Sequence, residues 1–228
     1  MGSVRPVVRG RAFLAGALVI VSALAACVRR APVLIPPSAG VEGVEGFGSA
    51  SIAGVEAAVK GKFSFVFRRP GFGRVEAVDP IGRTAFLIVF RDGRAWFVLP
   101  GKKVYAEDAA AVMMERFLGV ALEPDEAVGL LSGTWSAAGA ADEWRVDRDP
   151  KGRLSGGFRG AFSFTVQEFF PGDGVPREIG LEGPGTSGRV KVHRLGFNPG
   201  LRDEAFDTAF LSRFAAKTWD ELLELLDR

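Results

Sequence analysis

The sequence predicts an α+β fold: an incomplete antiparallel β-barrel, or half-barrel, with a helical lid and a C-terminal helix. Three observations lead to this prediction. Short apolar segments bounded by Gly, Pro or Asp follow one another with no crossover helix between them, which favours antiparallel neighbours. Two helical segments then interrupt the strands, and strands return after them. One strand is apolar on both faces, so both faces of the sheet need cover.

Residues 1–26 are predicted to be an export signal. Arg5, Arg9 and Arg11 precede an uncharged segment, 12–26, that is short for a membrane-spanning helix. The segment ends in Leu-Ala-Ala before Cys27, the one cysteine of the chain, which can form no disulfide within it. This ending resembles the lipobox of bacterial lipoproteins, and the resemblance implies that Cys27 is lipidated. The alternative is a chance cysteine behind an ordinary signal.

Composition and charge narrow the class of protein. The chain of 228 residues is 47% hydrophobic and 25% charged, as expected of one folded domain with tails. Removal of the signal takes away three arginines, so the net charge falls from +2 to −1. The remaining Lys and Arg are scattered, so a nucleic-acid partner is not expected. Val28 follows the cysteine where, in the enterobacterial sorting rule, an aspartate would retain a lipoprotein in the inner membrane; that resemblance implies the outer membrane.

The predicted domain boundaries follow changes in composition. Residues 27–48, rich in Pro and Gly, are predicted to be the lipidated cysteine and a flexible tether. Residues 49–200 are predicted to form the half-barrel domain, and 201–228 a C-terminal helical extension. Within the extension, 203–210 and 215–226 have helical patterns, and the second is expected to dock on its own domain through an apolar stripe. That stripe consists of Trp219, Leu222, Leu223 and Leu226.

The strands are predicted in two groups, with the helices between them. The first group is 49–59, 62–67, 74–78, 84–90 and 94–99, followed by a short strand at 103–105. The second group is 142–148, 153–158, 161–169, 177–182 and 188–197.

Phenylalanine dominates the predicted faces of the first group. Phe86, Ile88 and Phe90 share one face of their strand, while Leu87 and Val89 share the other. The chain has 19 Phe but a single Tyr, so aromatic bulk is used without hydroxyl groups. This usage favours a dry, concave apolar surface, and the alternative is an ordinary Phe-rich core.

Two helices are predicted to form the lid. The first begins after Asp108, whose carboxylate is expected to cap it, and ends before Gly119. Its apolar stripe is Val112, Met113, Phe117 and Leu118. The second begins near Pro124, with acidic residues in its first turn, and ends at Gly133. Met113 and Met114 suit irregular contacts with a ligand, but they also suit plain core filling.

Residues 74–133 resemble the outer-membrane lipoprotein receptor LolB and, more distantly, the periplasmic carrier LolA. The shared features are a strand leading to the turn Asp-Pro-Ile-Gly at 79–82, a hairpin, the helix start Tyr105-x-x-Asp108-Ala109, and a second short helix ending in Gly133. This resemblance covers about a quarter of the chain. It implies a half-barrel closed by helices, with a cavity that takes the acyl chains of other lipoproteins.

The same resemblance implies a set of site residues. The turn formed by Pro80, Ile81 and Gly82 matches the family's membrane-insertion loop, although Ile81 packing beneath its own turn is the alternative. The candidates for the acyl-chain cavity are Phe63, Phe65, Phe67, Phe86, Ile88, Phe90, Met113 and Phe117.

The predicted function is therefore a lipid-anchored, monomeric outer-membrane protein that faces the periplasm. It would accept lipoproteins from a LolA-like carrier and insert them into the outer membrane. The glycine-rich segment before Phe63 and the tail after Asn198 depart from the family pattern. They keep open a second hypothesis, a structural or adaptor lipoprotein whose C-terminal helix binds an envelope protein.

Catalysis is not expected. His193 is the one histidine of the chain and lies on the polar side of its predicted strand, beside Lys191. With Cys27 lipidated, no Cys/His pair or His-based metal cluster can be assembled, and no phosphate-binding loop is present. The sequence predicts no enzyme, no catalytic residue, no metal and no cofactor.

Overall fold

The computed structural model describes residues 33–54, 58–79, 81–135, 144–200 and 203–226. The chain divides into two units, 1–32 and 33–228, and every described element belongs to the second. Within the described residues, one sheet of 12 strands runs in the order β12-β6-β5-β4-β3-β2-β1-β11-β10-β9-β8-β7. Its edges, β12 and β7, are not paired with each other, so the observed sheet is open and mostly antiparallel, as predicted for a half-barrel.

The strands are β1 (Gly43–Ala53), β2 (Ala58–Arg68), β3 (Phe72–Val78), β4 (Thr84–Arg91), β5 (Arg94–Leu99), β6 (Val104–Ala109), β7 (Arg145–Arg148), β8 (Leu154–Arg159), β9 (Phe162–Phe169), β10 (Pro176–Gly183), β11 (Thr186–Phe197) and β12 (Ala215–Ala216). The helices are α2 (Ala110–Leu118), α3 (Pro124–Ser132) and α4 (Trp219–Leu226), with 3-10 turns η1 (Asp203–Phe206) and η2 (Ala209–Arg213). Every strand pair is antiparallel except β12 with β6.

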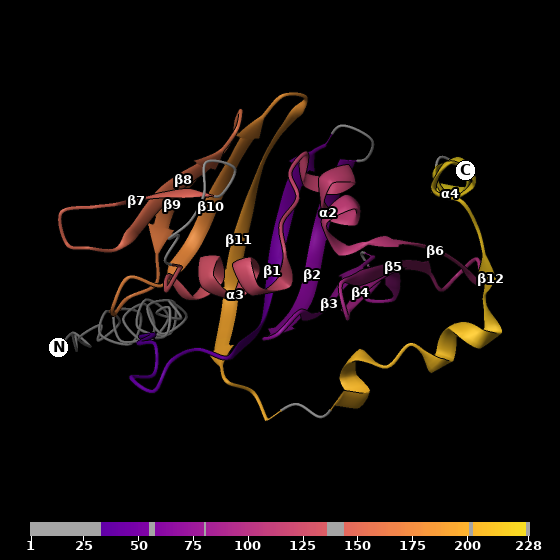
Figure 1. The fold of residues 1–228 in the computed structure, drawn as a ribbon, viewed down its shortest axis with the longest axis horizontal. Coiled ribbons are helices and arrows are strands. Elements are labelled where there is room, and N and C mark those ends of the chain that lie inside the picture. Colours follow the sequence, from indigo (N-terminus) through magenta and orange to yellow (C-terminus); the bar gives the residue numbers. More distant parts are fainter. Residues whose placement is uncertain (1–32, 55–57, 80, 136–143, 201–202, 227–228) are drawn as a thin grey trace, which may run out of the picture. The chain divides into compact units, whose positions relative to one another are not determined.

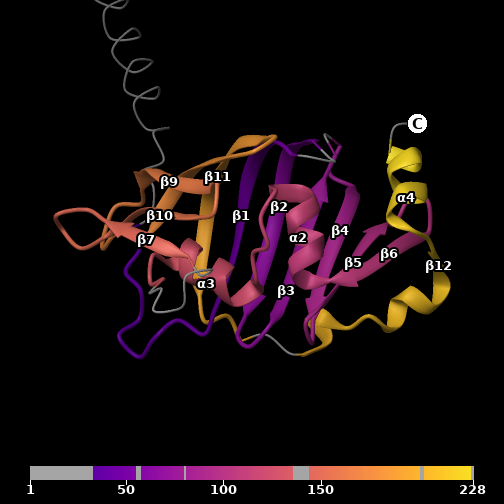
Figure 2. The ribbon, with the colours of Figure 1, turned by 45° about the horizontal axis from the view of Figure 1, so that its top comes forward.

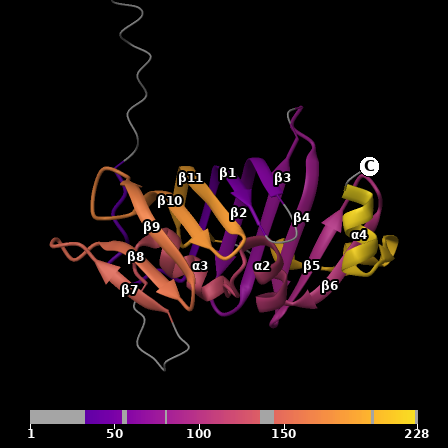
Figure 3. The same ribbon diagram turned by 90° about the horizontal axis from the view of Figure 1, so that it is seen from above.

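Two meanders make up the sheet. Strands β1 to β6 form the first and β7 to β11 the second, and the pairing of β1 with β11 joins them in the middle. Helices α2 and α3 come between the meanders in the chain and lie together on one face of the sheet (Figures 1 and 2). We call this the inner face, and the opposite side the outer face. Figure 3 shows α2 and α3 side by side across the strands.

Glycines on the inner face make room for phenylalanine rings. A Cβ built on Gly46 of β1 would collide with the Phe65 ring of β2, and one on Gly73 of β3 would lie 2.7 Å from Cδ1 of Phe67. The Phe63 ring lies over Gly48 in the same way, 3.1 Å from such a Cβ. Gly46 and Gly48 are therefore strand residues whose missing side chains are replaced by rings from the neighbouring strand.

This packing corrects the predicted boundary of the tether. Strand β1 begins at Gly43, so residues 43–48 belong to the sheet and not to a flexible segment before residue 49. Val41 and Val44 are also buried. The glycines that suggest a linker in the sequence instead leave space for the Phe side chains of β2.

A substitution of Gly46 by alanine tests this packing. The new methyl would meet the Phe65 ring and the Arg194 carbonyl oxygen, and a backbone atom cannot swing away as a side chain end can. We expect the free energy of unfolding to fall by about 1 to 3 kcal/mol, the usual cost of overpacking a core. Urea unfolding measures this value. Gly101→Ala is the matched control, because nothing lies within 4 Å of its Cβ position, and an equal loss in both variants would contradict the explanation.

The two apolar faces predicted for 84–90 are both covered, by different parts of the chain. Ile88 and Phe90 of β4 are buried on the inner face, whereas Leu87 and Val89 are buried on the outer face with Val98 and Leu211 of η2. The polypeptide after β11 therefore supplies the outer cover. Leu211 of η2 packs on the outer face, and the chain then pairs with the edge of the sheet as β12. It continues into α4 (Figure 1).

Several predicted element boundaries need correction. Asp108 does not cap α2, because β6 stays paired with β5 as far as Ala109, the residue before the helix. Its carboxylate instead accepts hydrogen bonds from the Ala109 amide at 2.8 Å and from Arg116 at 3.2 Å. Val112, expected in the apolar stripe of α2, is exposed.

The predicted helix at 203–210 is replaced by η1 and η2, and the predicted helix at 215–226 begins only at Trp219, after β12. The stops at Gly119 and Gly133 are confirmed, both in left-handed conformation.

Candidate functional site

The eight candidates for the acyl-chain cavity come together on the inner face. Phe63 and Phe86 are half-buried, and the other six are at most 7% exposed. The rings of Phe63, Phe65, Phe67 and Phe90 form a row with centroid distances of 5.8, 6.1 and 6.3 Å. Phe117 of α2 lies 6.2 Å from Phe86. In this conformation, the candidates form a packed apolar layer between the sheet and its helices.

Two aromatic residues outside the predicted set of cavity residues complete this layer. Phe97 of β5 lies 5.1 Å from Phe86 and 5.2 Å from Phe117. Trp219 of α4 contacts Phe97 and Phe117 edge-on at 5.4 and 5.3 Å. Phe97 follows Trp96 in an apolar strand, and successive side chains of a strand point to opposite faces. This alternation could have assigned Phe97 to one face. Nothing in the sequence indicated which surface Trp219 would cover.

The C-terminal helix docks on its own domain, as predicted. Trp219 and Leu222 are both buried, and the guanidinium of Arg116 lies 5.3 Å from the centroid of the Trp219 ring. These two members of the predicted stripe therefore point into the protein. They are not available to a partner while α4 stays docked.

Helix α3 is tied to the sheet at its start. The carboxylate of Asp125 accepts a hydrogen bond from the Gly71 amide at 2.7 Å, and Arg159 of β8 lies 3.4 Å from Glu126. Glu123 precedes the helix and forms a reciprocal capping box with Glu126. Burial raises the pKa of the Glu123 carboxyl, and the neighbouring Glu126 and Asp125 charges raise it further. Polar contacts from β8 and from the β2–β3 turn thus hold this cover in place.

The turn between β3 and β4 presents Ile81 to solvent. One oxygen of the Asp79 side chain accepts hydrogen bonds from the amides of Ile81 at 3.0 Å and Arg83 at 2.8 Å. The other oxygen pairs with the Arg83 guanidinium at 3.0 Å. Gly82 adopts a φ of +84°, which favours glycine. Ile81 is 74% exposed, so it does not pack beneath the turn.

The same pentapeptide pattern, Asp-Pro-x-Gly-Arg, occurs again at 149–153 between β7 and β8. Asp149 binds the amides of Lys151 and Arg153 at 2.9 and 3.0 Å and the Arg153 guanidinium at 2.7 Å, and Gly152 has a φ of +77°. The two turns therefore form equivalent sets of hydrogen bonds. They differ in the variable position, which is isoleucine in one and an exposed lysine in the other.

Electrostatics fix both turns at neutral pH. The Arg83 amide, followed by the Arg83 side chain, lowers the pKa of Asp79, and the Arg153 side chain lowers the pKa of Asp149. A lowered pKa in the folded state means that the ionised carboxylate stabilises the fold above the unfolded value of about 3.9. The contribution is lost as the pH falls through the folded pKa. Both carboxylates are therefore ionised at neutral pH, where they stabilise their turns.

The remaining residues of interest in the sequence are Cys27, Pro80 and His193. Cys27 and Pro80 lie outside the described residues. His193 is exposed on β11, with its Nε2 atom 3.1 Å from the Ser49 hydroxyl. Among the described residues, no group of three or more His, Cys, Asp or Glu could hold a metal ion. Over the same part of the chain, no helix has the length and apolarity needed to cross a membrane.

Comparisons with known proteins give a likeness of fold. No protein-family model matches the chain, and no curated protein matches it in sequence. Three of the solved structures that match this chain do so over similar lengths. A DUF1329 family protein from Desulfovibrio piger is 12% identical, with a TM-score of 0.49, and covers 75% of this chain and 92% of its own. A LolA superfamily protein from Nitrosomonas europaea is 12% identical, with a TM-score of 0.48, and covers 74% and 91%.

The third structure has a higher TM-score than the other two. It is a domain from Vibrio parahaemolyticus described as an outer membrane lipoprotein-sorting protein domain. It is 11% identical, has a TM-score of 0.51, and covers 75% of this chain and 92% of its own. The open, mostly antiparallel sheet with α2 and α3 on its inner face is therefore a fold that this chain shares with that domain.

Proposed function

We propose that this protein is a lipid-anchored lipoprotein receptor of the outer membrane. Cys27 carries the anchor, and the inner face binds the acyl chains of other lipoproteins. These arrive from a LolA-like periplasmic carrier and pass into the outer membrane at the turn that bears Ile81. The shared fold with a lipoprotein-sorting domain supports this proposal.

The observation that carries the proposal is the exposure of Ile81. An isoleucine that is 74% exposed on a turn held by Asp79 contributes nothing to the core. The equivalent turn at 149–153 folds with a lysine in its place, so the turn itself does not require an apolar residue. An aliphatic side chain on a fixed, protruding turn is suited to enter a bilayer, because its burial there is favourable.

The inner face supplies the acyl-binding surface. Its residues are aliphatic and aromatic, and the rings present no hydroxyl group to the layer beneath the helices. Because six of the eight candidates are at most 7% exposed, acyl chains enter only when the helical cover moves. Transfer follows differences in affinity between carrier, receptor and membrane, so the proposed process needs no catalysis and no cofactor.

Acyl-chain uptake and delivery test the proposal directly. The protein lacking residues 1–27, which keeps the whole unit 33–228, is mixed with a fluorescent fatty acid. In a second assay, it receives an acylated lipoprotein from a LolA-like carrier in the presence of phospholipid vesicles. We expect saturable uptake of the fatty acid and faster appearance of the lipoprotein in the vesicles. A protein that neither takes up the fatty acid nor accelerates transfer would contradict the proposed function.

A further inference from the structure

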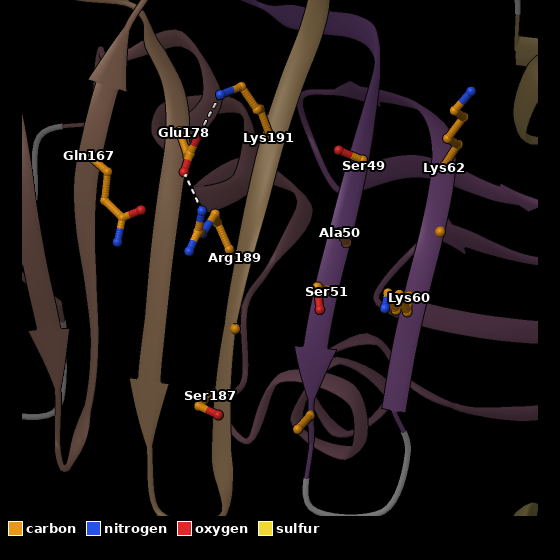
Figure 4. A pocket seen from close by; sticks show the side chains of 13 residues that line it. Ser49, Ala50, Ser51, Lys60, Lys62, Gln167, Glu178, Ser187, Arg189 and Lys191 are labelled. Atoms are coloured by element: carbon orange, nitrogen blue, oxygen red, sulfur yellow. Dashed lines mark hydrogen bonds and ion pairs between the residues drawn. The ribbon is translucent and has the colours of Figure 1, made fainter.

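A polar groove lies on the outer face, opposite the acyl-binding layer. Its volume is about 860 Å³, and it follows strand β1 between β2 and β11 (Figure 4). The floor is made of small side chains, among them Ser49 and Ser51. The walls are made of long cationic ones, Lys60 and Lys62 on β2 and Arg189 and Lys191 on β11. The groove exists because β1 has small residues where its neighbours have long ones.

Strand register arranges these side chains in two rows. One row runs Lys62, Ser49, Lys191 and Glu178 across four adjacent strands. The next row runs Lys60, Ser51, Arg189 and Gly180. Directly paired residues have their Cβ atoms about 5 Å apart, so each serine lies between two cations.

Charge compensation differs between the rows. Lys191 binds two carboxylates, Glu178 at 2.6 Å and Glu168 at 3.0 Å, and the hydrogen bond with Glu178 raises the pKa of Lys191. In the other row, the position equivalent to Glu178 is Gly180, which has no side chain. Among the described residues, Arg189 has one acidic partner, the Glu178 carboxylate at 3.1 Å, which Lys191 also binds. The Arg189 side chain stays 63% exposed.

Lys60 and Lys62 complete the excess of positive charge. Neither has an ion-pair or hydrogen-bond partner among the described residues, and both are exposed. The hydroxyl of Ser51, between Lys60 and Arg189, likewise has no hydrogen-bond partner in this part of the chain. The row of Lys60, Ser51 and Arg189 thus has two cationic residues whose Cα atoms are about 10 Å apart, with an unpartnered hydroxyl group between them.

This row lies at the end of the sheet that carries Ile81. Lys62 pairs with Val78, the last residue of β3, and Asp79 begins the turn immediately after it. Lys60 is two residues further along β2 in the same direction. The groove and the Ile81 turn therefore open toward the same end of the sheet.

We propose that the groove binds the phosphate group of an anionic phospholipid. This inference rests on the proposed function, because it assumes that the Ile81 end meets a membrane. Lysine, arginine and hydroxyl groups are the donors that bind phosphodiester oxygens, and cations near an anionic bilayer are attracted to its surface. The phosphate would take the place between Lys60 and Arg189 that no carboxylate of the described residues fills, and would orient the receptor while Ile81 enters the apolar region.

Vesicle binding measures this contribution. The protein lacking residues 1–27 is titrated with vesicles of phosphatidylcholine alone and with vesicles containing phosphatidylglycerol. We expect tighter binding to the anionic vesicles, and the double variant Lys60→Ala/Arg189→Ala should lose about 30-fold in affinity for them. Ser51→Asp should lose a similar amount while both cations remain, because its carboxylate would occupy the place of the phosphate.

A matched double variant controls for net charge. Lys151→Ala/Arg213→Ala removes two exposed cations elsewhere and should leave affinity for anionic vesicles within about twofold of the wild type. Equal losses in both double variants, or unchanged binding by Ser51→Asp, would overturn the proposal. So would binding of inorganic phosphate at this row without preference for anionic vesicles, since the groove would then serve a free anion.

The result is separable from the test of the proposed function. The groove and the acyl-binding layer lie on opposite faces, so the groove variants should take up fluorescent fatty acid like the wild type. A wild-type protein that binds anionic vesicles through this row but takes up no fatty acid would overturn the proposed function alone. Normal uptake of fatty acid, together with equal affinity for both kinds of vesicle, would overturn only the proposal that the groove binds phospholipid.

Discussion

Replacement of Ile81 by lysine is expected to lower delivery of lipoproteins into vesicles about tenfold or more. Burial of an isoleucine side chain in an apolar phase is worth about 1.5 to 3 kcal/mol, and a lysine in its place adds the cost of bringing a charge toward the bilayer. Delivery is measured as the rate at which lipoprotein passes from the loaded receptor to vesicles. Uptake of fluorescent fatty acid by the inner face should stay unchanged.

The chain supplies its own evidence that this variant folds. Ile81→Lys recreates at 79–83 the sequence found at 149–153, where the same hydrogen bonds form around Asp149. The free energy of unfolding should therefore change by less than about 0.5 kcal/mol, as for other exposed substitutions. Lys151→Ile is the reciprocal control, and it should leave delivery unchanged. A normal delivery rate for Ile81→Lys would remove the main support for the proposed function.

The sequence predicted much of this fold because its strands are bounded by clear turn residues. Strand β5 has the predicted bounds, and β4 differs from its predicted range by one residue. The two apolar faces of β4 correctly required cover on both sides of the sheet. The start of β1 was missed because Gly46 and Gly48 suggest a linker until the Phe side chains of β2 are seen to cover them. Glycine has this double meaning in any single sequence.

The candidate site likewise has one part that the sequence predicted and one part that it did not. Alternation along a strand was enough to assign Phe63, Phe65 and Phe67 to one face. The groove on the outer face could not be predicted, because Lys60 and Arg189 meet across β1 only after residues far apart in the chain have paired in register. The position of Trp219 also depends on the path of the chain around β6. Local patterns carry no information about either arrangement.

Replacement of Trp219 by alanine is expected to destabilise the protein by about 3 to 5 kcal/mol, the usual cost of removing a large aromatic side chain from a core. The indole covers Phe97 and Phe117, so its loss opens a space in the apolar layer that is proposed to bind acyl chains. A fatty acid should fill this space. Added fatty acid should therefore raise the unfolding midpoint of Trp219→Ala more than that of the wild type, since a ligand stabilises the folded state that binds it.

Trp96 provides the matched control because it packs on the outer face, against the cluster of Leu87, Val89, Val98 and Leu211. Trp96→Ala should also be less stable than the wild type, but fatty acid should stabilise it no more than it stabilises the wild type. Equal rescue of both variants would mean that the lipid binds without regard to face, and no rescue of Trp219→Ala would mean that the layer beneath α4 is ordinary core. Selective rescue of Trp219→Ala requires that an acyl chain and the indole compete for one place, so α4 would have to withdraw when the receptor is loaded.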